Sequence, residues 1–270
     1  MVSYLNTPPK GEKNKIAIQD SYTSKSEYKG EFAKWYASSI EEFGGPHSVV
    51  IPAMICLLPC RLYGLQIADI GCGSGILSRE LALRGAEVLG VDLSEDMLEL
   101  ARQAEERIHL GIVYQQDDAC VLSSVTDHSQ DAVTMCLSLT DMPNIEAVFS
   151  QISRILKFGG CLIASLPHPC APCSSHIGLD YPQHSYYEEI RWMSSNRQSV
   201  RGRIPTYHRP LSLYINLALQ HGLVLERMLE PQPSPLLLAR YPQYERVPYM
   251  LVLRFRLQCF RPQENETWQK

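Results

Sequence analysis

The stretch Leu65-Gln-Ile-Ala-Asp-Ile-Gly-Cys-Gly-Ser-Gly75 decides the fold. It runs from an apolar strand pattern into three alternate glycines and then into a helical pattern. Glycine permits a positive φ and a close approach of the backbone to a ligand, and a helix N-terminus offers free N–H donors. The stretch therefore predicts a site for a nucleotide-like ligand. A tight strand-to-helix turn that binds nothing is the alternative.

A second signal lies at the end of the next apolar run, Val88-Leu-Gly-Val-Asp92. In a βαβ unit this carboxylate lies beside the glycine loop, where it can accept both hydroxyls of an adenosine ribose. The alternative is a solvated acid next to the helix that begins at Ser94, a residue type favoured as a helix cap. Together with the glycines, Asp92 favours an adenosine-containing ligand.

Short apolar runs alternate with amphipathic segments from Leu65 onward, as in repeated βα units around a parallel sheet. The pattern predicts strands at 65–70, 87–92, 112–116, 131–137, 160–166, 223–229 and 249–257. It predicts helices at 21–43, 75–84, 94–107, 143–156 and 210–220, the fourth of them stopped by Gly159 and Gly160. We expect a tail and helical cap at 1–60, a ligand-binding core at 61–167, a lid insertion at 168–209, and sheet completion with a polar tail at 210–270.

Composition excludes several classes of protein. The chain has 270 residues, of which 45% are hydrophobic and 20% charged, as in an ordinary globular protein. The net charge of −4 gives no field for a polyanion, so neither nucleic acid nor a membrane is an expected partner. The apolar window 49–59 is shorter than the roughly 20 residues of a membrane span. The polar N-terminus and nine cysteines, an odd number, favour a cytoplasmic protein without a disulfide framework.

The segments Asp69-Ile-Gly71-Cys-Gly73-Ser-Gly75, Asp92 and Asp118-Ala119 resemble successive motifs of class I S-adenosylmethionine-dependent methyltransferases, particularly the small-molecule branch. The resemblance covers about 67–166 well and the last two strands more loosely. The spacing is Gly-x-Gly-x-Gly, whereas the nicotinamide fingerprint is Gly-x-Gly-x-x-Gly, and position 76 is Ile. The resemblance implies an α/β, Rossmann-like, doubly wound sheet of seven strands with the last one antiparallel.

The resemblance also implies roles for individual residues toward the cofactor, S-adenosyl-L-methionine. Asp69 would lie near the methionine amino group, with Gly71, Cys72 and Gly73 under the methionine part. Asp92 would hold the ribose. The adenine would be flanked by Leu93 and Met97 and bound by Asp118 with Ala119, and the sulfonium would lie beside Leu137 and Ser138. If the family motif is aligned one residue earlier, Asp117 instead of Asp118 would bind the adenine.

The acceptor side is predicted from the insertion, which begins at the carboxyl end of a strand. His168 is either a base toward an attacking hydroxyl or amine, or a structural residue between two prolines. Tyr207 and His208, in a Tyr-His-Arg segment that resembles one in small-molecule members of the family, either line the pocket or pack under the lid. The aromatic residues of the insertion suit a flat or cationic acceptor, although they are equally core residues: Tyr181, Tyr186, Tyr187 and Trp192.

Two further features are weaker. His168, Cys170, Cys173 and His176 have the residue types of a zinc site, but they are crowded into nine positions, so we expect no metal. The N-terminal tyrosines either close over the cofactor or pack in the core: Tyr22, Tyr28 and Tyr36.

We therefore predict a methyltransferase that acts on a nitrogen or oxygen of a small molecule by in-line displacement, as a monomer or homodimer, with carbon methylation also possible. The alternatives are an NAD-dependent oxidoreductase and a catalytically silent cofactor-binding partner subunit. The segment Ser138-Leu-Thr-Asp141 stands where DNA adenine methyltransferases carry an Asn-Pro-Pro-Tyr type motif, which argues against that branch.

Overall fold

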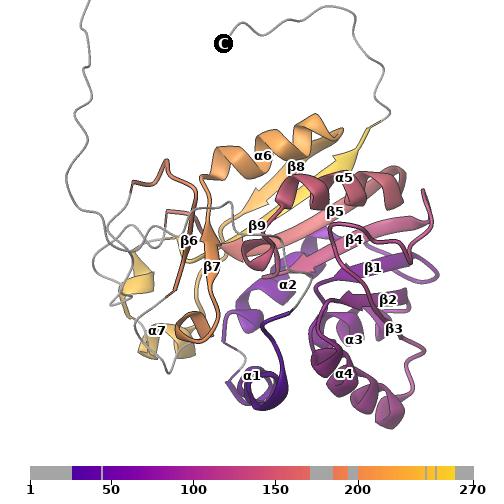
Figure 1. Ribbon diagram of the computed structural model, residues 1–270, viewed down its shortest axis with the longest axis horizontal. Coiled ribbons are helices and arrows are strands. Elements are labelled where there is room, and N and C mark those ends of the chain that lie inside the picture. Colours follow the sequence, from indigo (N-terminus) through magenta and orange to yellow (C-terminus); the bar gives the residue numbers. More distant parts are fainter. Residues whose placement is uncertain are drawn as a thin grey trace, which may run out of the picture.

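The computed structural model describes residues 26–43, 45–170, 185–193, 200–240, 242–246 and 248–258. Its centre is a seven-stranded sheet of order β3-β2-β1-β4-β5-β9-β8 (Figure 1). The strands are β1 (Gln66–Ile70), β2 (Glu87–Asp92), β3 (Val113–Gln116), β4 (Gln130–Cys136), β5 (Leu156–Pro167), β8 (Leu223–Leu229) and β9 (Met250–Leu257). All seven lie within a few residues of the apolar runs that predict them.

The direction of the strands confirms the expected doubly wound topology. The pairs β1–β2, β1–β4, β2–β3 and β4–β5 are parallel. β9 is antiparallel to both of its neighbours, β5 and β8, so it runs against the rest of the sheet. The order reverses at β1, and a doubly wound sheet binds its ligand at such a reversal, at the carboxyl ends of the strands.

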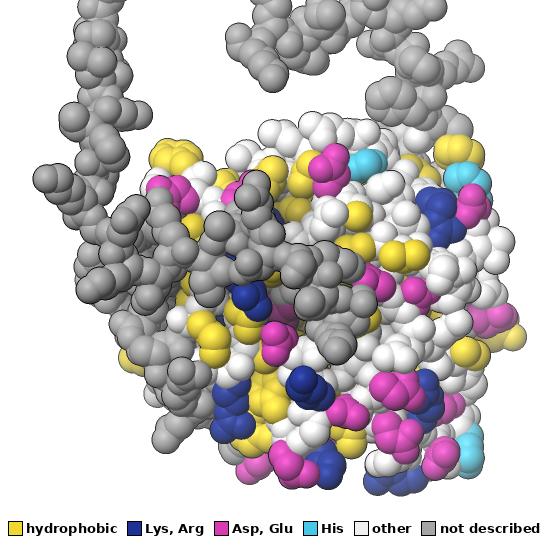
Figure 2. Space-filling view, in the orientation of Figure 1, with side chains coloured by type: hydrophobic (Ala, Val, Ile, Leu, Met, Phe, Trp, Pro, Cys, Tyr) yellow, Lys and Arg dark blue, Asp and Glu magenta, His cyan; other side chains and the backbone are white. Residues whose placement is uncertain are grey.

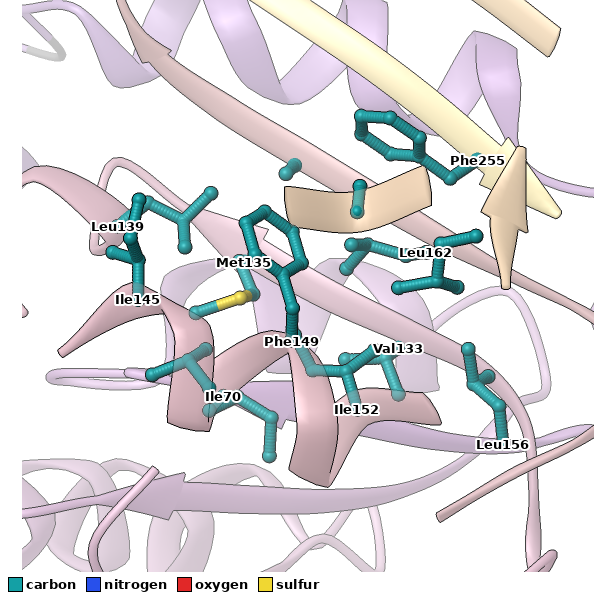
Figure 3. Close-up of a cluster of buried hydrophobic side chains, with 14 of the residues drawn as sticks. Ile70, Val133, Met135, Leu139, Ile145, Phe149, Ile152, Leu156, Leu162 and Phe255 are labelled. Carbon is teal, nitrogen blue, oxygen red and sulfur yellow. The ribbon is translucent and has the colours of Figure 1, made fainter. Parts of the chain in front are cut away.

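Helices cover both faces of the sheet and make two cores. On one face lie α5 (Ile145–Ile155) and α6 (Leu211–Gln220), and Phe149 of α5 packs with strand residues such as Met135 and Leu162 (Figure 3). On the other lie α2 (His47–Leu57), α3 (Ile76–Ala82) and α4 (Glu95–Ile108). The strands are apolar on both faces because both are buried.

The N-terminal cap holds two helices rather than one. α1 (Gly30–Phe43) lies within the predicted 21–43, whose first five positions fall outside the described residues. α2 occupies the apolar window near residue 50, has Pro52 in its interior and buries Val50 and Met54. In the described part of the chain, no helix is long and apolar enough to cross a membrane.

One predicted boundary is wrong. The helix expected over 143–156 ends at Ile155, and β5 begins at Leu156. Gly159 does not stop the helix. It has a φ of 80° inside the strand, where the β4–β5 register is irregular between Gln130 and Ala132. Glycine is needed because the bulge requires a positive φ.

The described parts of the insertion form a small sheet beside the strand ends. β6 (Ile190–Trp192) and β7 (Thr206–His208) pair antiparallel, and the short helix η3 (Val200–Gly202) precedes β7. The other short elements are η1 (Leu139–Asp141), α7 (Pro235–Arg240) and η4 (Pro242–Glu245).

Charge is mixed on the surface that Figure 2 shows. Acidic and basic side chains both lie on this surface. α4 carries five acidic and two basic residues, and one of the basic ones, Arg102, pairs with Glu95 at 2.6 Å. This helix is therefore locally acidic, whereas the net charge of the whole chain is only −4.

Candidate functional site

The glycine loop connects β1 to α3 in a conformation that only glycine adopts easily. Gly71, Gly73 and Gly75 have φ values of 72°, 55° and 77°. A Cβ on Gly71 would lie 2.5 Å from Cβ of Ser138, which closes the loop from the end of β4. The loop is therefore shaped by both backbone conformation and close packing.

Asp92 ends β2 and ties that strand to the loop. One of its carboxylate oxygens accepts a hydrogen bond from the backbone N–H of Gly73 at 2.8 Å, and the other accepts one from the N–H of Ser94 at 2.8 Å. Burial raises the pKa of Asp92, and these hydrogen bonds oppose the rise. Ser94 also caps α4, as predicted, because its hydroxyl accepts from the N–H of Met97.

Asp69 lies under the loop on β1 and is fully buried. The hydroxyls of Ser78 and Thr134 donate to its two carboxylate oxygens at 2.6 and 2.8 Å. Burial raises the pKa of Asp69 to about 6, and the two hydroxyl hydrogen bonds lower it in part. The carboxylate therefore joins β1, α3 and β4 beneath the site.

These elements surround a cavity of about 440 Å³. It is lined by every residue that the sequence predicts for cofactor binding: Asp69, Gly71, Cys72, Gly73, Asp92, Leu93, Met97, Asp118, Ala119, Leu137 and Ser138. These residues come from the ends of four different strands. They meet in one cavity because the carboxyl ends of parallel strands lie at the same edge of the sheet.

Asp117 and Asp118 both line the cavity but have different partners. Asp117 accepts from the N–H of Ser124 at 2.8 Å and from the hydroxyl of Ser123 at 3.3 Å. Although burial raises its pKa, these hydrogen bonds produce a net lowering. Asp118 also accepts within the loop, from the N–H of Cys120 at 2.8 Å, so the two carboxylates are both held by the loop and both face the cavity.

The three predicted catalytic residues occupy different places. Tyr207 lines the cavity. His168 is buried outside the lining, with Nε2 3.0 Å from Glu230, and its Nδ1 accepts from the N–H of Cys170 at 3.1 Å. His208 is also buried outside the lining, with Nε2 2.9 Å from the carbonyl of Tyr186. Catalytic roles for the two histidines stay predictions.

Only some of the other residues predicted for the acceptor side lie within the described ranges. Tyr186 accepts a hydrogen bond from the N–H of Leu211 at 3.0 Å, and Tyr187 is exposed. Among the described residues, no three His, Cys, Asp or Glu side chains are placed to hold a metal. Four residues named above lie outside the described ranges: Tyr22, Cys173, His176 and Tyr181.

Sequence reasoning missed part of the cavity wall. Among the additional lining residues are several from α1, α2, the end of β4 and the turn after it, and the insertion: Ile40, His47, Cys136, Asp141, Met142, Arg191, Ile204 and Pro205. Tyr28 and Tyr36, left open between cofactor and core, line the cavity too. Asp141 follows the predicted sulfonium contact Ser138 by three positions, which is the one signal that could have found it.

Comparisons with known proteins agree with this geometry. Residues 68–164 match the methyltransferase domain family. The ubiquinone biosynthesis O-methyltransferase of Glaesserella parasuis is 37% identical over 108 residues, which are 38% of this chain and 46% of the relative. That of Pseudomonas fluorescens strain SBW25 is 30% identical over 173 residues, 58% of this chain and 75% of the relative.

A solved structure shows the same fold. An S-adenosylmethionine-dependent methyltransferase from Mesorhizobium loti superposes with a TM-score of 0.64 at 28% identity, covering 76% of this chain and 96% of that one. The chain spans about half the length of the first curated relatives it matches. Together with the 75% coverage of the Pseudomonas enzyme, the shared fold and the glycine loop, these matches show that the chain belongs to the class I S-adenosylmethionine-dependent methyltransferases.

Proposed function

We propose that this protein transfers the methyl group of S-adenosyl-L-methionine to a nitrogen or oxygen nucleophile of a small molecule. One observation carries the proposal: a single cavity gathers all eleven residues that family resemblance assigns to the cofactor. The methyl carbon of the donor is already activated by the positive sulfur. The main tasks of the chain are then alignment and exclusion of water.

The residues present fit this cofactor. Gly71 lets the loop pack directly on Ser138, because a Cβ there would meet Cβ of Ser138 at 2.5 Å, and this close packing holds the loop backbone in the cavity wall where the methionine part would lie. Asp92 is a half-buried carboxylate whose two oxygens each accept one backbone N–H, and each oxygen has a further lone pair for a ribose hydroxyl. Asp118 takes the adenine side because the Asp118-Ala119 pair matches the family motif, and its carboxylate lines the cavity while Oδ1 accepts from the N–H of Cys120 at 2.8 Å.

The N-terminal segment supplies a cover. The hydroxyl of Ser94 donates to the backbone carbonyl of Tyr28, and the N–H of Gly30 donates to Asp96 at 2.6 Å. These contacts hold the segment before α1 against the start of α4, next to Asp92. The cover excludes water from the cavity, which in-line transfer to a weak nucleophile requires.

The relatives and the cavity wall both support a small-molecule acceptor. The relatives from Glaesserella parasuis and Pseudomonas fluorescens are ubiquinone biosynthesis O-methyltransferases. In this chain the cavity wall beyond the cofactor residues includes the aromatic and apolar side chains Tyr36, Ile204 and Tyr207, beside charged residues such as Asp141 and Arg191. A flat small molecule suits such a wall.

Calorimetric titration with S-adenosylmethionine, S-adenosylhomocysteine and NAD tests the proposal. We expect micromolar binding of the first two and none of NAD. Asp92→Ala loses about 1–3 kcal/mol of binding free energy, as for a buried charged hydrogen-bond partner. Asp127→Ala, at an exposed aspartate that pairs with Arg154, leaves the affinity unchanged. Binding of NAD alone, or of none of the three to folded protein, contradicts the proposal, and absence of methylated product with any acceptor favours the silent subunit.

A further inference from the structure

Tyr28 and Asp141 form a hydrogen-bonded pair in the wall of the cavity. The Tyr28 hydroxyl donates to Oδ2 of Asp141 at 2.9 Å, and both residues line the cavity. Asp141 ends η1, a turn that starts beside the glycine loop, where the Ser138 hydroxyl donates to the carbonyl of Ile70 at 3.1 Å. The pair therefore adjoins the glycine loop, at a place that none of the cofactor roles uses.

The insertion holds Asp141 from the other side. Arg201 donates to Oδ1 of Asp141, and its second nitrogen lies 3.3 Å from the Thr140 hydroxyl. The Thr206 hydroxyl donates to the carbonyl of Thr140 at 3.0 Å. One carboxylate oxygen is thus fixed by a guanidinium, and the other meets Tyr28. The guanidinium also makes the Asp141–Arg201 pair neutral overall.

The phenol of Tyr28 has capacity for a second partner. A phenolic oxygen that donates its single proton still has lone pairs for a second donor. Burial raises the pKa of Tyr28, the charge of Asp141 raises it further and the charge of Arg201 lowers it, so the phenol stays protonated. Tyr36, whose ring centre lies 5.0 Å away, has a side-chain hydrogen bond with Tyr28 and is also kept protonated by burial. The phenolic oxygen of Tyr28 has two lone pairs, so this contact leaves one of them for the acceptor.

We propose that Tyr28 and Asp141 form a proton relay for a neutral phenolic hydroxyl of the acceptor, which makes the reaction an O-methylation. This inference rests on the proposed function. The acceptor hydroxyl donates to the Tyr28 oxygen. As the acceptor oxygen bonds to the methyl carbon, the carbon–sulfur bond breaks and its electron pair goes to sulfur. The acceptor proton passes to Tyr28, and the Tyr28 proton passes to Asp141.

The charge beside Tyr28 favours a hydroxyl over an ammonium group. A cationic acceptor hydrogen-bonded there would need an unpaired carboxylate, but Asp141, the carboxylate that Tyr28 contacts, is already paired with Arg201. The net-neutral pair instead matches a neutral donor of one hydrogen bond. Tyr28 contacts the acceptor and is the catalytic residue of the relay, whereas Asp141 acts through Tyr28.

A binding measurement without turnover is the first test. The probe is 4-nitrophenol, whose phenol and phenolate absorb at different wavelengths, titrated with pH on the complex with S-adenosylhomocysteine. In the wild type the relay holds the probe as the phenol, so its phenolate band appears at higher pH than for free 4-nitrophenol. Asp141→Asn abolishes this shift and Tyr28→Phe reduces it. Tyr63→Phe, at a tyrosine that is 88% exposed, leaves it unchanged.

A turnover measurement is the second test. With phenol, which stays protonated at neutral pH, we expect Tyr28→Phe and Asp141→Asn each to lower kcat about 100-fold, as for loss of general base catalysis. With 4-nitrophenol at a pH where it is ionised, the loss is less than about threefold because no proton has to be removed. A residue that only maintains structure would lower both rates equally.

The outcomes separate this relay from the proposed function. Equal losses with both phenols, an unshifted phenolate band, or a wild type that methylates aniline and benzylamine but neither phenol overturns the relay and leaves methyl transfer standing. Failure of the wild type to bind S-adenosylmethionine overturns the proposed function itself. If Asp141→Asn does not fold, Tyr28→Phe decides, provided that its melting temperature and cofactor affinity match those of Tyr63→Phe.

Discussion

The carboxylate of Asp92 accepts a hydrogen bond from the backbone N–H of Gly73 at 2.8 Å, across 19 positions of sequence. The two strongest signals in the sequence, the glycine loop and the strand-end acid, are therefore one structural unit. In the proposed site, Asp92 both binds the ribose and fixes the loop. Its removal affects two functions at once, so a binding loss measured for Asp92→Ala is an upper limit for the ribose contact alone.

Gly71→Ala tests whether close packing of the loop matters for cofactor binding. The added Cβ meets Ser138 at 2.5 Å in addition to the strain of φ +72°. The matched control is Gly64→Ala, at φ +73° with nothing within 4 Å of its Cβ. Both variants lose about 1–2 kcal/mol of stability from the left-handed conformation. Only Gly71→Ala loses cofactor affinity in calorimetry, and equal affinities for the two variants contradict the assignment.

Asp69 gives a pH dependence of stability with a defined sign. Burial raises the pKa of Asp69 in the folded protein to about 6, from an ordinary value of 3.8 for an aspartate. The folded state therefore binds the proton more tightly, and its contribution to stability is present below about pH 4 and lost as the pH rises through about 6. In urea unfolding between these pH values, wild type loses about 2–3 kcal/mol relative to Asp69→Asn. A difference between the two that does not change with pH contradicts the raised pKa.

His168→Ala separates a structural from a catalytic histidine. The ring bridges Glu230 and the N–H of Cys170, outside the cavity lining. Burial lowers its pKa, and Glu230 opposes this, so the ring is neutral at neutral pH. We expect a loss of about 1–2 kcal/mol in urea unfolding and unchanged cofactor affinity. Undiminished turnover would remove His168 from the catalytic set, and a large loss of kcat with intact stability would restore it.

Arg209 supports the proposed acceptor side of the cavity wall through contacts with the residues that line it. Its guanidinium is 3% exposed, donates to the carbonyls of Met142 and Pro143 at 2.8 and 3.0 Å, and lies 4.5 Å from the ring centre of Tyr207. Lysine lacks the planar fork, so Arg209→Lys lowers the free energy of unfolding by about 1.5–3 kcal/mol.

The control for that measurement is Arg84→Lys. Arg84 pairs with Glu80 on the surface, and its side chain is 43% exposed, so this change stays within about 0.5 kcal/mol. Equal stabilities of the two lysine variants in urea unfolding would show that Arg209 does not support the cavity wall.

The sheet could be predicted, and the residues proposed for the cofactor could be placed at one edge of it, because their signals are local. Each strand is a short apolar run, and Asp69, Gly71 and Asp92 stand at fixed positions relative to strand ends. From the sequence alone, Gly159 indicates the end of a helix, because a helix C-terminus and an irregular strand register both use a glycine with positive φ. α2 was not distinguished because an apolar helix without a polar face shows no clear period.

The acceptor half could not be predicted because its residues come from distant segments. Tyr28 and Asp141 are 113 positions apart, and Arg201 and Asp141 are 60 apart. No local pattern joins them, and only the folded sheet brings them to one cavity. His168 shows the converse: its position at the end of β5 was predicted, but its partner Glu230, which follows β8, was not.

A crystal structure of the protein with S-adenosylhomocysteine tests the central claim most directly. The account predicts the ribose hydroxyls within hydrogen-bond distance of Asp92, the adenine beside Asp118, and the sulfur facing the part of the cavity that Tyr28 and Asp141 line. Electron density for the ligand outside this cavity, or a ribose without contact to Asp92, would contradict it.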